Sequence, residues 1–141
     1  MSYSRRDLNV FIGAVAATAA ADAQKAVLPS KMLKYEDFPV RTNGANFSRA
    51  MIQGIAHSGF PFDMHETDLP AGGAPHPPHH HEHEEMVMIR EGTLEVTISG
   101  KKSTLGPGSV IYAASNEEHG WRNVGTTRAK YFVMAFGRPV V

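Results

Sequence analysis

Histidine is concentrated in one short stretch of the chain. Five of the eight histidines lie between residues 76 and 83. His79 and His81 are two residues apart, so on an extended chain both imidazoles point to the same side. Neutral imidazoles bind first-row divalent metals, which makes this stretch a candidate metal site. The alternative is a solvated polar run that binds metals only adventitiously, because such tracts are compositional features.

Two residues outside the tract can complete a metal site. Glu85 keeps the parity of His79 and His81 if the chain stays extended or makes a compensating turn, and it contributes a carboxylate. His119 is the only histidine further along the chain, and it is expected in a turn after an apolar strand. Two imidazoles and a carboxylate form a facial ligand set, to which His119 can add a third imidazole.

The spacing of these residues resembles the two motifs of the small single-domain cupins. The first motif is matched at every fixed position, by Gly73, His79, His81, Glu85 and Gly92. The second motif is matched in part, by Gly108, His119 and Asn123. The resemblance covers roughly residues 45–136. It implies an all-β fold, the antiparallel double-stranded β-helix or jelly-roll barrel of the cupins, with one divalent metal at its centre. It also implies four metal ligands, which are His79, His81, Glu85 and His119.

Two positions depart from the second motif. Its usual proline is Ala114 in this chain, and its usual glycine is Asn116. The loop that enters His119 is therefore expected to be less rigid than in the family.

Several other side chains are candidates for the pocket or for catalysis. His83 shares the ligands' parity and is expected to be a solvated histidine, with a residue that supports the ligands or an alternative ligand as the other interpretations. His80 is expected to face away. Trp121 shares the parity of His119 and is expected either to wall the pocket or to pack in the core. The sequence offers no obvious separate nucleophile. The candidates for a general base are Glu85, His83 and Tyr131.

The remaining candidates are assigned to pocket walls or to packing. Those that could line the barrel are Arg49, Gln53 and Tyr131. Those expected as core or surface imidazoles are His57 and His65. Those expected in packing, with a subunit interface as the alternative, are Met86, Met88 and Met134. Because small cupins are often dimers, the resemblance favours a homodimer.

From Phe47 onward the pattern predicts many short strands. They are expected at residues 47–57, 60–69, 85–89, 93–99, 110–113 and 129–136. Turns that contain Gly or Pro separate them at residues 70–73, 100–101 and 106–108. Residues 47–141 are therefore expected to form one barrel. An N-terminal arm, residues 24–46, precedes it and carries one short strand at Met32–Glu36.

Residues 1–23 have the three regions of an export signal. Arg5 and Arg6 lie near the start, an apolar stretch follows, and a small-residue cleavage site ends at Ala23. The apolar stretch is shorter than the ~20 residues that a membrane-spanning helix needs. Residues 4–8 resemble the twin-arginine motif, but Asn9 departs from it, so general secretion stays open as the route. We expect removal of residues 1–23 and a mature protein in the periplasm or outside a bacterial cell, without membrane attachment.

Composition excludes several classes of protein. Fourteen basic and fourteen acidic residues cancel, so no overall field attracts nucleic acid. The chain has no cysteine, which excludes disulfides, thiolate metal sites and cysteine nucleophiles. No helix-turn-helix pattern accompanies the barrel, which argues against a transcription factor.

Three function classes remain for such a site. Three neutral imidazoles and one carboxylate around a divalent ion leave a charge of about plus one, which favours an anionic or enolisable oxygen ligand. The first class is a metal-dependent enzyme of the dioxygenase type that acts on a small oxygenated or aromatic compound. The second is a non-redox isomerase or lyase, and the third is a module that only binds a small molecule or metal. The ion is expected to be Fe, Mn, Ni, Cu or Zn.

Overall fold

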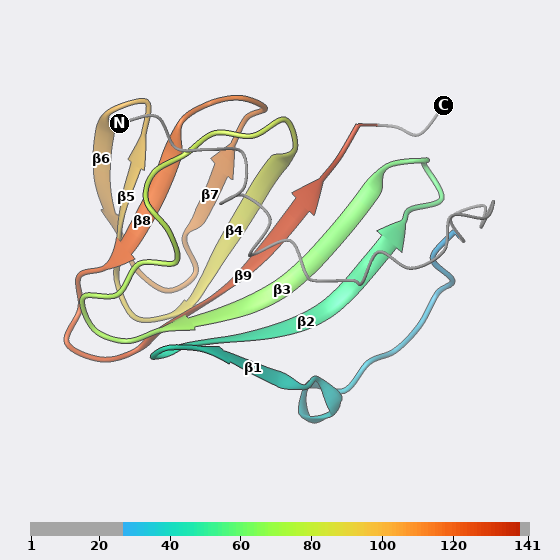
Figure 1. Cartoon of the computed structure of the whole chain (residues 1–141), viewed down its shortest axis with the longest axis horizontal. Helices are drawn as coiled ribbons and strands as arrows, with labels where there is room; N and C mark the ends of the chain where they lie inside the picture. Colours follow the sequence, from blue (N-terminus) through green and yellow to red (C-terminus); the bar gives the residue numbers. More distant parts are fainter. Residues whose placement is uncertain (1–26, 139–141) are drawn as a thin grey trace.

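The fold consists of two antiparallel sheets that pack face to face (Figure 1). The computed structural model describes residues 27–138, so the expected export signal lies outside this range. The larger sheet has the strand order β1-β2-β3-β9-β4-β7, and the smaller sheet has the order β6-β5-β8. The all-β antiparallel fold expected from the sequence is confirmed. Within the described range, no helix has both the length and the apolar content to span a membrane.

The strand bounds follow the alternation of apolar and polar residues closely. The strands are β1 (Val40–Asn43), β2 (Asn46–Ile55), β3 (Pro61–Leu69), β4 (Glu84–Glu91), β5 (Leu94–Ile98), β6 (Lys101–Leu105), β7 (Val110–Ala113), β8 (His119–Asn123) and β9 (Ala129–Phe136). The bounds of β7 and β9 are those expected, and β2 to β5 differ from expectation by at most two residues at either end. His119 begins β8 and does not lie in a turn, which corrects the expectation for that residue.

The sequence did not predict β6. Four of its five residues are exposed, so it lacks the apolar face that marks a strand. The hairpin turn that precedes it is centred on Ser99 and Gly100, one residue earlier than expected. Their φ angles of 46° and 78° suit the type I′ turn that joins two antiparallel strands.

The core lies between the two sheets. Its buried side chains come from the inward faces of both, and they are Leu69, Val87, Ile89, Leu94, Val96, Ile111, Trp121, Ala129, Tyr131 and Val133. Alternation along β9 shows the pattern most clearly, because Ala129, Tyr131 and Val133 are buried while the residues between them are not. These packed layers form the scaffold that positions the histidine-rich loop, which contains residues 76–83.

The N-terminal arm has its strand at a different place from the one expected. Residues 31–34 have no regular structure, and Tyr35–Asp37 form a short 3-10 helix, so the strand expected at Met32–Glu36 is wrong. The strand of the arm is β1, which pairs with β2 through a hairpin at Gly44 (φ 58°). Tyr35 leaves the extended conformation because its side chain is bound by the sheet.

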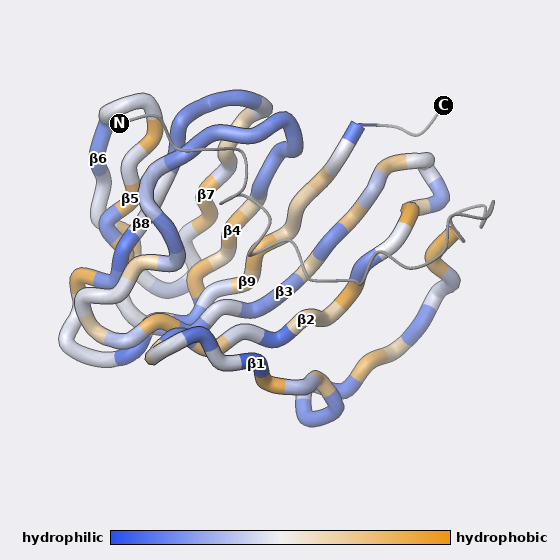
Figure 2. Tube along the Cα trace, viewed as in Figure 1, coloured by the Kyte–Doolittle hydropathy of each residue, from blue (hydrophilic) through white to orange (hydrophobic). Residues whose placement is uncertain are grey.

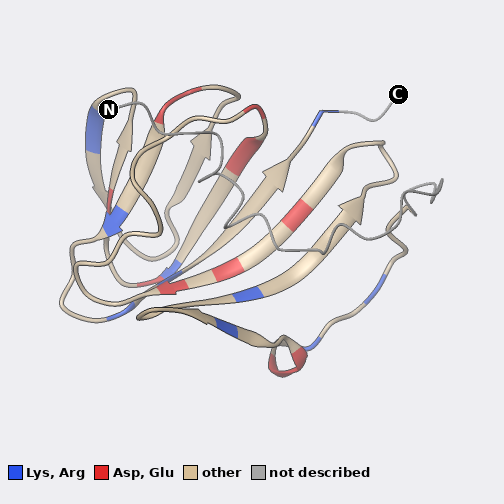
Figure 3. Ribbon diagram, in the orientation of Figure 1, with Lys and Arg blue, Asp and Glu red and all other residues tan. Residues whose placement is uncertain are grey.

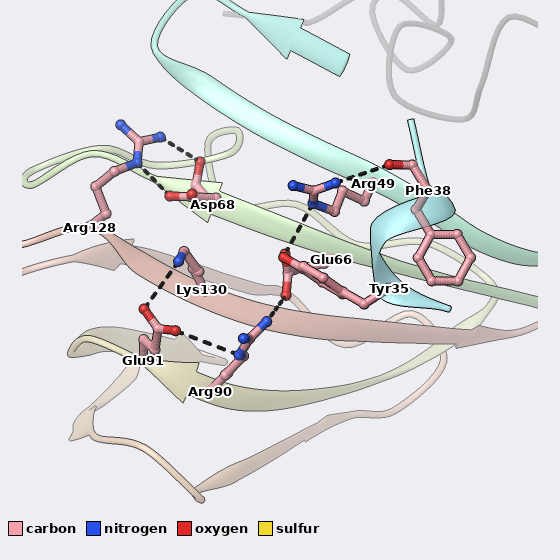
Figure 4. A network of polar contacts seen from close by, with 9 residues as sticks. All are labelled: Tyr35, Phe38, Arg49, Glu66, Asp68, Arg90, Glu91, Arg128 and Lys130. Atoms are coloured by element: carbon pink, nitrogen blue, oxygen red, sulfur yellow. Dashed lines mark hydrogen bonds and ion pairs between the residues drawn. The ribbon is translucent and has the colours of Figure 1, made fainter. Parts of the chain in front are cut away.

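A buried carboxylate on the outer face of the large sheet binds this arm (Figure 4). The Tyr35 hydroxyl donates to Glu66 Oε1 at 2.6 Å, and Arg90 donates to Glu66 Oε2 at 2.9 Å. The guanidinium of Arg49 lies 4.7 Å from the centre of the Tyr35 ring, and it also donates to the carbonyl of Phe38. Figure 3 shows the same arrangement by charge, with a basic position on β2 beside acidic ones on β3.

Arg49 therefore does not line the barrel, which corrects the sequence-based expectation. It is the direct partner of Glu66 across β2 and β3, on the outer side of the sheet. A bulge between Ala50 and Ile52 shifts the register, so Gln53 pairs with Asp63 on the opposite side from Arg49. Gln53 is on the inward side but is exposed.

Strands β9, β4 and β7 of the large sheet are hydrophobic along much of their length (Figure 2), and on their outer face apolar side chains are neighbours. Met64, Met134, Met86 and Tyr112 are consecutive partners across four strands. The next row contains Phe132, Met88 and Val110. Met88 and Val110 are 43% and 51% exposed, so nothing in the described chain covers this end of the face.

Candidate metal centre

The histidine-rich loop and the start of β8 are fastened to each other by their backbones. His79 and His119 exchange both hydrogen bonds of an antiparallel bridge, at 3.0 and 2.9 Å. The amide of Asn116 donates to the carbonyl of His81 at 2.7 Å, and the Ser115 hydroxyl donates to the carbonyl of Glu82 at 2.7 Å. Two segments that are far apart in the sequence are thus held in one fixed register, which sets the relative positions of their imidazoles.

Backbone carbonyls fix the tautomers of three histidines. A carbonyl only accepts hydrogen bonds, so each ring nitrogen that contacts one must carry the proton. His81 Nδ1 donates to the carbonyl of His83 at 2.8 Å, and His119 Nδ1 donates to that of Glu117 at 2.8 Å. His79 Nδ1 makes the corresponding, longer contact with the carbonyl of Pro77 at 3.3 Å. Each Nε2 is therefore left with its lone pair, the form that binds a metal.

These three lone pairs converge. Ligand atoms of His79, His81 and His119 lie within 4.8 Å of one another, a grouping that could hold a metal ion. The ring centres are 5.1 Å apart for His79 and His81, 5.1 Å for His79 and His119, and 4.7 Å for His81 and His119. The Nε2 atoms of His81 and His119 are buried without a hydrogen-bond partner. Buried polar atoms are rarely left in this way, so these residues fit a bound cation.

Glu85 adds a carboxylate from the first residues of β4. Its Oε1 lies 3.3 Å from His81 Nε2, and its Oε2 lies 3.4 Å from His119 Nε2. Burial raises the pKa of Glu85, but contacts with the surrounding imidazoles lower it by more, so the pKa lies well below its usual range. Glu85 is therefore an anion at any physiological pH. The structure brings it against His81 and His119, the two most deeply buried imidazoles of the group.

Imidazole pKa values differ across the group. Burial, together with the neighbouring His76, lowers the pKa of His79 to about 4. Burial also lowers the pKa of His119, but contacts with the Glu85 carboxylate and with Glu117 together raise it by more, and the pKa lies above its ordinary value. His79 is thus neutral and ready to bind metal near pH 7, whereas a proton competes more effectively at His119.

We expect metal to be lost when the pH falls. Each imidazole must be neutral to coordinate, so bound metal should dissociate below a pH of ~6, with His119 taking up a proton before His79. Dialysis at stepped pH followed by elemental analysis measures this. Full occupancy in strong acid would contradict a site built from three imidazoles.

The other histidines occupy distinct positions. His76 contacts His79, with ring centres 3.9 Å apart, a contact that the sequence did not reveal because neither strand parity nor the motif includes it. His83 stacks on His81 and reaches Glu85. His80 is exposed, as expected, and so is His57. His65 is half-buried and bonded to Asp63 at 3.0 Å.

Trp121 and Tyr131 lie in the barrel interior beside the imidazoles. Trp121 stacks on His119 with ring centres 5.9 Å apart, and it meets Tyr131 edge to face at 5.8 Å. Trp121 Nε1 and the Tyr131 hydroxyl are buried without hydrogen-bond partners. Within the described chain, the buried polar side-chain atoms that lack partners are therefore these two and the two Nε2 atoms.

The departures from the second motif leave the loop in a defined conformation. Asn116 has φ 63°, a left-handed conformation that asparagine adopts more readily than other non-glycine residues. Asn116 therefore replaces the usual glycine and keeps the backbone geometry, and its backbone N–H donates to the carbonyl of His81. The lower rigidity of this loop stays a prediction. In the first motif, Gly92 is required because a Cβ there would lie 2.6 Å from Ala129 Cα.

Comparison with known proteins identifies the family. Residues 65–135, about half of the chain, match the family described as Cupin domain. The chain belongs to the cupin family. The fold of this cupin is shared with an RmlC-like cupin from Shewanella frigidimarina, which is 15% identical with a TM-score of 0.65; the match covers 78% of this chain and 93% of that one. No curated protein sequence matches the chain.

Two further solved structures share the fold. The polyketide cyclase RemF from Streptomyces resistomycificus is 20% identical with a TM-score of 0.61, and 80% of this cupin and 83% of that chain are covered. A predicted oxalate decarboxylase from Thermotoga maritima is 15% identical with a TM-score of 0.64, and the match covers 77% of this cupin and all of that chain. At these identities the likeness shows the fold and not the activity.

Proposed function

We propose that this cupin is a metal-dependent enzyme of the dioxygenase type that acts on a small oxygenated or aromatic compound. One divalent ion would be held by His79, His81, Glu85 and His119. The observation that carries the proposal is the convergence of three imidazole lone pairs whose tautomers are already set by backbone carbonyls. A polar tract that binds metals adventitiously has no reason to arrange its Nδ1 protons in this way.

The donor set is suited to a first-row metal. A bound ion would supply Lewis acidity, together with redox chemistry if it is iron, copper or manganese. Nitrogen and carboxylate ligands without thiolate favour these metals, nickel or zinc over magnesium or calcium. Four protein ligands leave room for a substrate that offers one or two oxygen atoms.

Buried donors beside the imidazoles can position such a substrate. Burial raises the pKa of the Tyr131 hydroxyl well above its ordinary value, so it stays protonated and donates. Trp121 Nε1 is a donor only. An acceptor oxygen of a small compound would satisfy these two groups, whose burial without a partner is otherwise unfavourable. Because Tyr131 holds its proton, Glu85 and His83 are the better candidates for proton acceptance.

The proposal is tested by oxygen consumption. We expect protein loaded with Fe²⁺ or Cu²⁺ to consume dioxygen in step with the loss of a substrate drawn from small phenols and hydroxy or keto acids. Replacement of Tyr131 by phenylalanine keeps the ring and should raise KM, because it removes one donor. Turnover of the same compounds without dioxygen would show an isomerase or lyase, and saturable binding without turnover would show a binding module.

We also propose that this cupin forms a homodimer through the apolar outer face of its large sheet. The rows that contain Met86 and Met88 are adjacent and partly exposed, and an apolar patch of this kind commonly marks an interface. Light scattering after size-exclusion chromatography should give twice the mass of one chain. Met88→Glu should give the monomer mass, whereas Val124→Glu, at a similarly exposed apolar position just after β8, should not. A monomeric wild-type protein would contradict the proposal.

Export to the periplasm or the medium is a further proposal, supported by the charge, apolar length and cleavage pattern of residues 1–23. Mass spectrometry of the protein from a periplasmic fraction should give an N-terminus at Gln24. An intact Met1 in the cytoplasmic fraction would contradict it.

A further inference from the structure

His83 extends the candidate metal centre toward solvent. The exposed fraction of the side chain differs across the site, and it is 28% for His83, 13% for Glu85, 8% for His81 and 0% for His119. Among these four side chains, an ion that arrives from solvent has the most open access to His83. His83 is the first of these residues that can act as a ligand.

The orientation of His83 is defined by two neighbours. Its ring lies parallel to that of His81, with an interplanar angle of 7° and ring centres 3.5 Å apart. Its Nε2 is directed at Glu85 Oε1, at 3.3 Å. A freely solvated histidine would have neither contact. His80, three residues earlier in the same tract, is exposed and serves as the internal comparison.

Glu85 Oε1 is consequently contacted by two imidazoles at the same distance. His81 Nε2 and His83 Nε2 both lie 3.3 Å from it. Ligand atoms of His81, His83 and Glu85 lie within 4.8 Å of one another, so they form a second group that could hold a metal ion. Two imidazoles and a carboxylate are a sufficient set for a first-row divalent ion.

We propose that His81, His83 and Glu85 form an outer coordination position, which a divalent ion occupies on its way to and from the inner ligands. The inference rests on the proposed metal-binding function and adds a path to it. The arriving ion would take the place of the proton between His83 and Glu85, and the proton leaves to solvent, to which His83 is open.

The two positions hold one ion in turn. The inner group consists of His79, His81 and His119, and the outer group consists of His81, His83 and Glu85. The two groups share His81, whose single Nε2 lone pair coordinates one ion at a time. Movement inward exchanges His83 for His79 and His119, while His81 stays bound. The ion is therefore never released from all its protein ligands during entry, which lowers the barrier in both directions. A step of this kind changes the rates of uptake and release without changing the final affinity.

The rates of Co²⁺ uptake and release test this inference. Uptake is followed by stopped-flow absorbance of the Co²⁺ bands, and release is followed by transfer to an excess of EDTA. We expect His83→Ala to slow both rates about tenfold, with a dissociation constant within about threefold of the wild-type value. His83→Gln keeps a hydrogen-bond donor for Glu85 but cannot coordinate as an imidazole, so it should behave like His83→Ala. His80→Ala should match the wild type.

Several results would overturn the inference. Unchanged rates in His83→Ala would mean that His83 is a bystander. Faster release with weaker binding would mean that His83 is a permanent ligand of the inner ion. Recovery of wild-type rates by His83→Gln would mean that it only supports Glu85. In each case the wild-type protein still binds Co²⁺ and the proposed function stands, whereas a wild-type protein that binds no Co²⁺ would remove both.

Discussion

Replacement of His119 by alanine is expected to weaken metal binding by at least about a hundredfold, because the change removes one of only three converging imidazoles. His119 is fully buried, its Nε2 has no other hydrogen-bond partner, and its Nδ1 is held by the carbonyl of Glu117. The backbone bridge to His79 does not involve the side chain, so the loop should keep its position. Isothermal titration with Zn²⁺ measures the loss.

His80→Ala is the matched control, because His80 belongs to the same histidine-rich tract but is exposed. It should bind Zn²⁺ as the wild type does. Thermal unfolding of the metal-free His119→Ala protein shows whether the barrel is intact. An intact His119→Ala barrel with unchanged Zn²⁺ affinity would mean that the tract binds metal without β8.

Replacement of Asn123 by alanine is expected to lower the free energy of unfolding by about 3 kcal/mol, because it leaves several buried backbone groups without partners. The side-chain amide donates to the carbonyls of Thr127 at 2.7 Å, Pro70 at 3.1 Å and Leu69 at 3.3 Å. Its oxygen accepts from the amide of Gly125 at 2.9 Å. Asn123 is fully buried, so water cannot replace these hydrogen bonds.

Urea unfolding of the metal-free protein measures this effect. Asn43→Ala is the control, because Asn43 is exposed and its replacement should cost less than about 0.5 kcal/mol. Equal stability of the Asn123→Ala and Asn43→Ala proteins would show that the network around Asn123 contributes nothing. The motif residue Asn123 is thus explained as a structural anchor that joins the turn after β3 to the turn between β8 and β9, and not as a ligand.

Local sequence pattern was sufficient for the strands that contain alternating apolar residues. The bounds of β7 and β9 were predicted because both are short, mostly apolar runs, with Gly108 and Ser109 before β7 and Gly137 after β9. β6 was missed because an exposed edge strand buries no apolar face. The conformation of Tyr35 was missed for another reason. It depends on Glu66, a residue 31 positions away, and local pattern carries no information about such a contact.

For the candidate site too, local pattern predicted some features and missed those that depend on the rest of the fold. Spacing was sufficient to single out His79, His81, Glu85 and His119, and the structure places them at the meeting of the histidine-rich loop, β4 and β8. Alternation along the strand predicts that Arg49 and Gln53 face the same side of the sheet. This prediction is wrong for Arg49, because a bulge between the two residues places them on opposite sides. The contacts of His76 and His83 depend on the path of an irregular loop, where a period of two residues does not apply.

X-ray absorption of the Zn²⁺-loaded protein tests most directly whether imidazoles from both segments of chain meet at one ion. We expect one zinc per chain and a spectrum of three imidazole nitrogens and one carboxylate oxygen, with bond lengths of about 2.0–2.2 Å. A first shell dominated by water oxygens, or one with a single imidazole, would contradict the site from which the function is proposed.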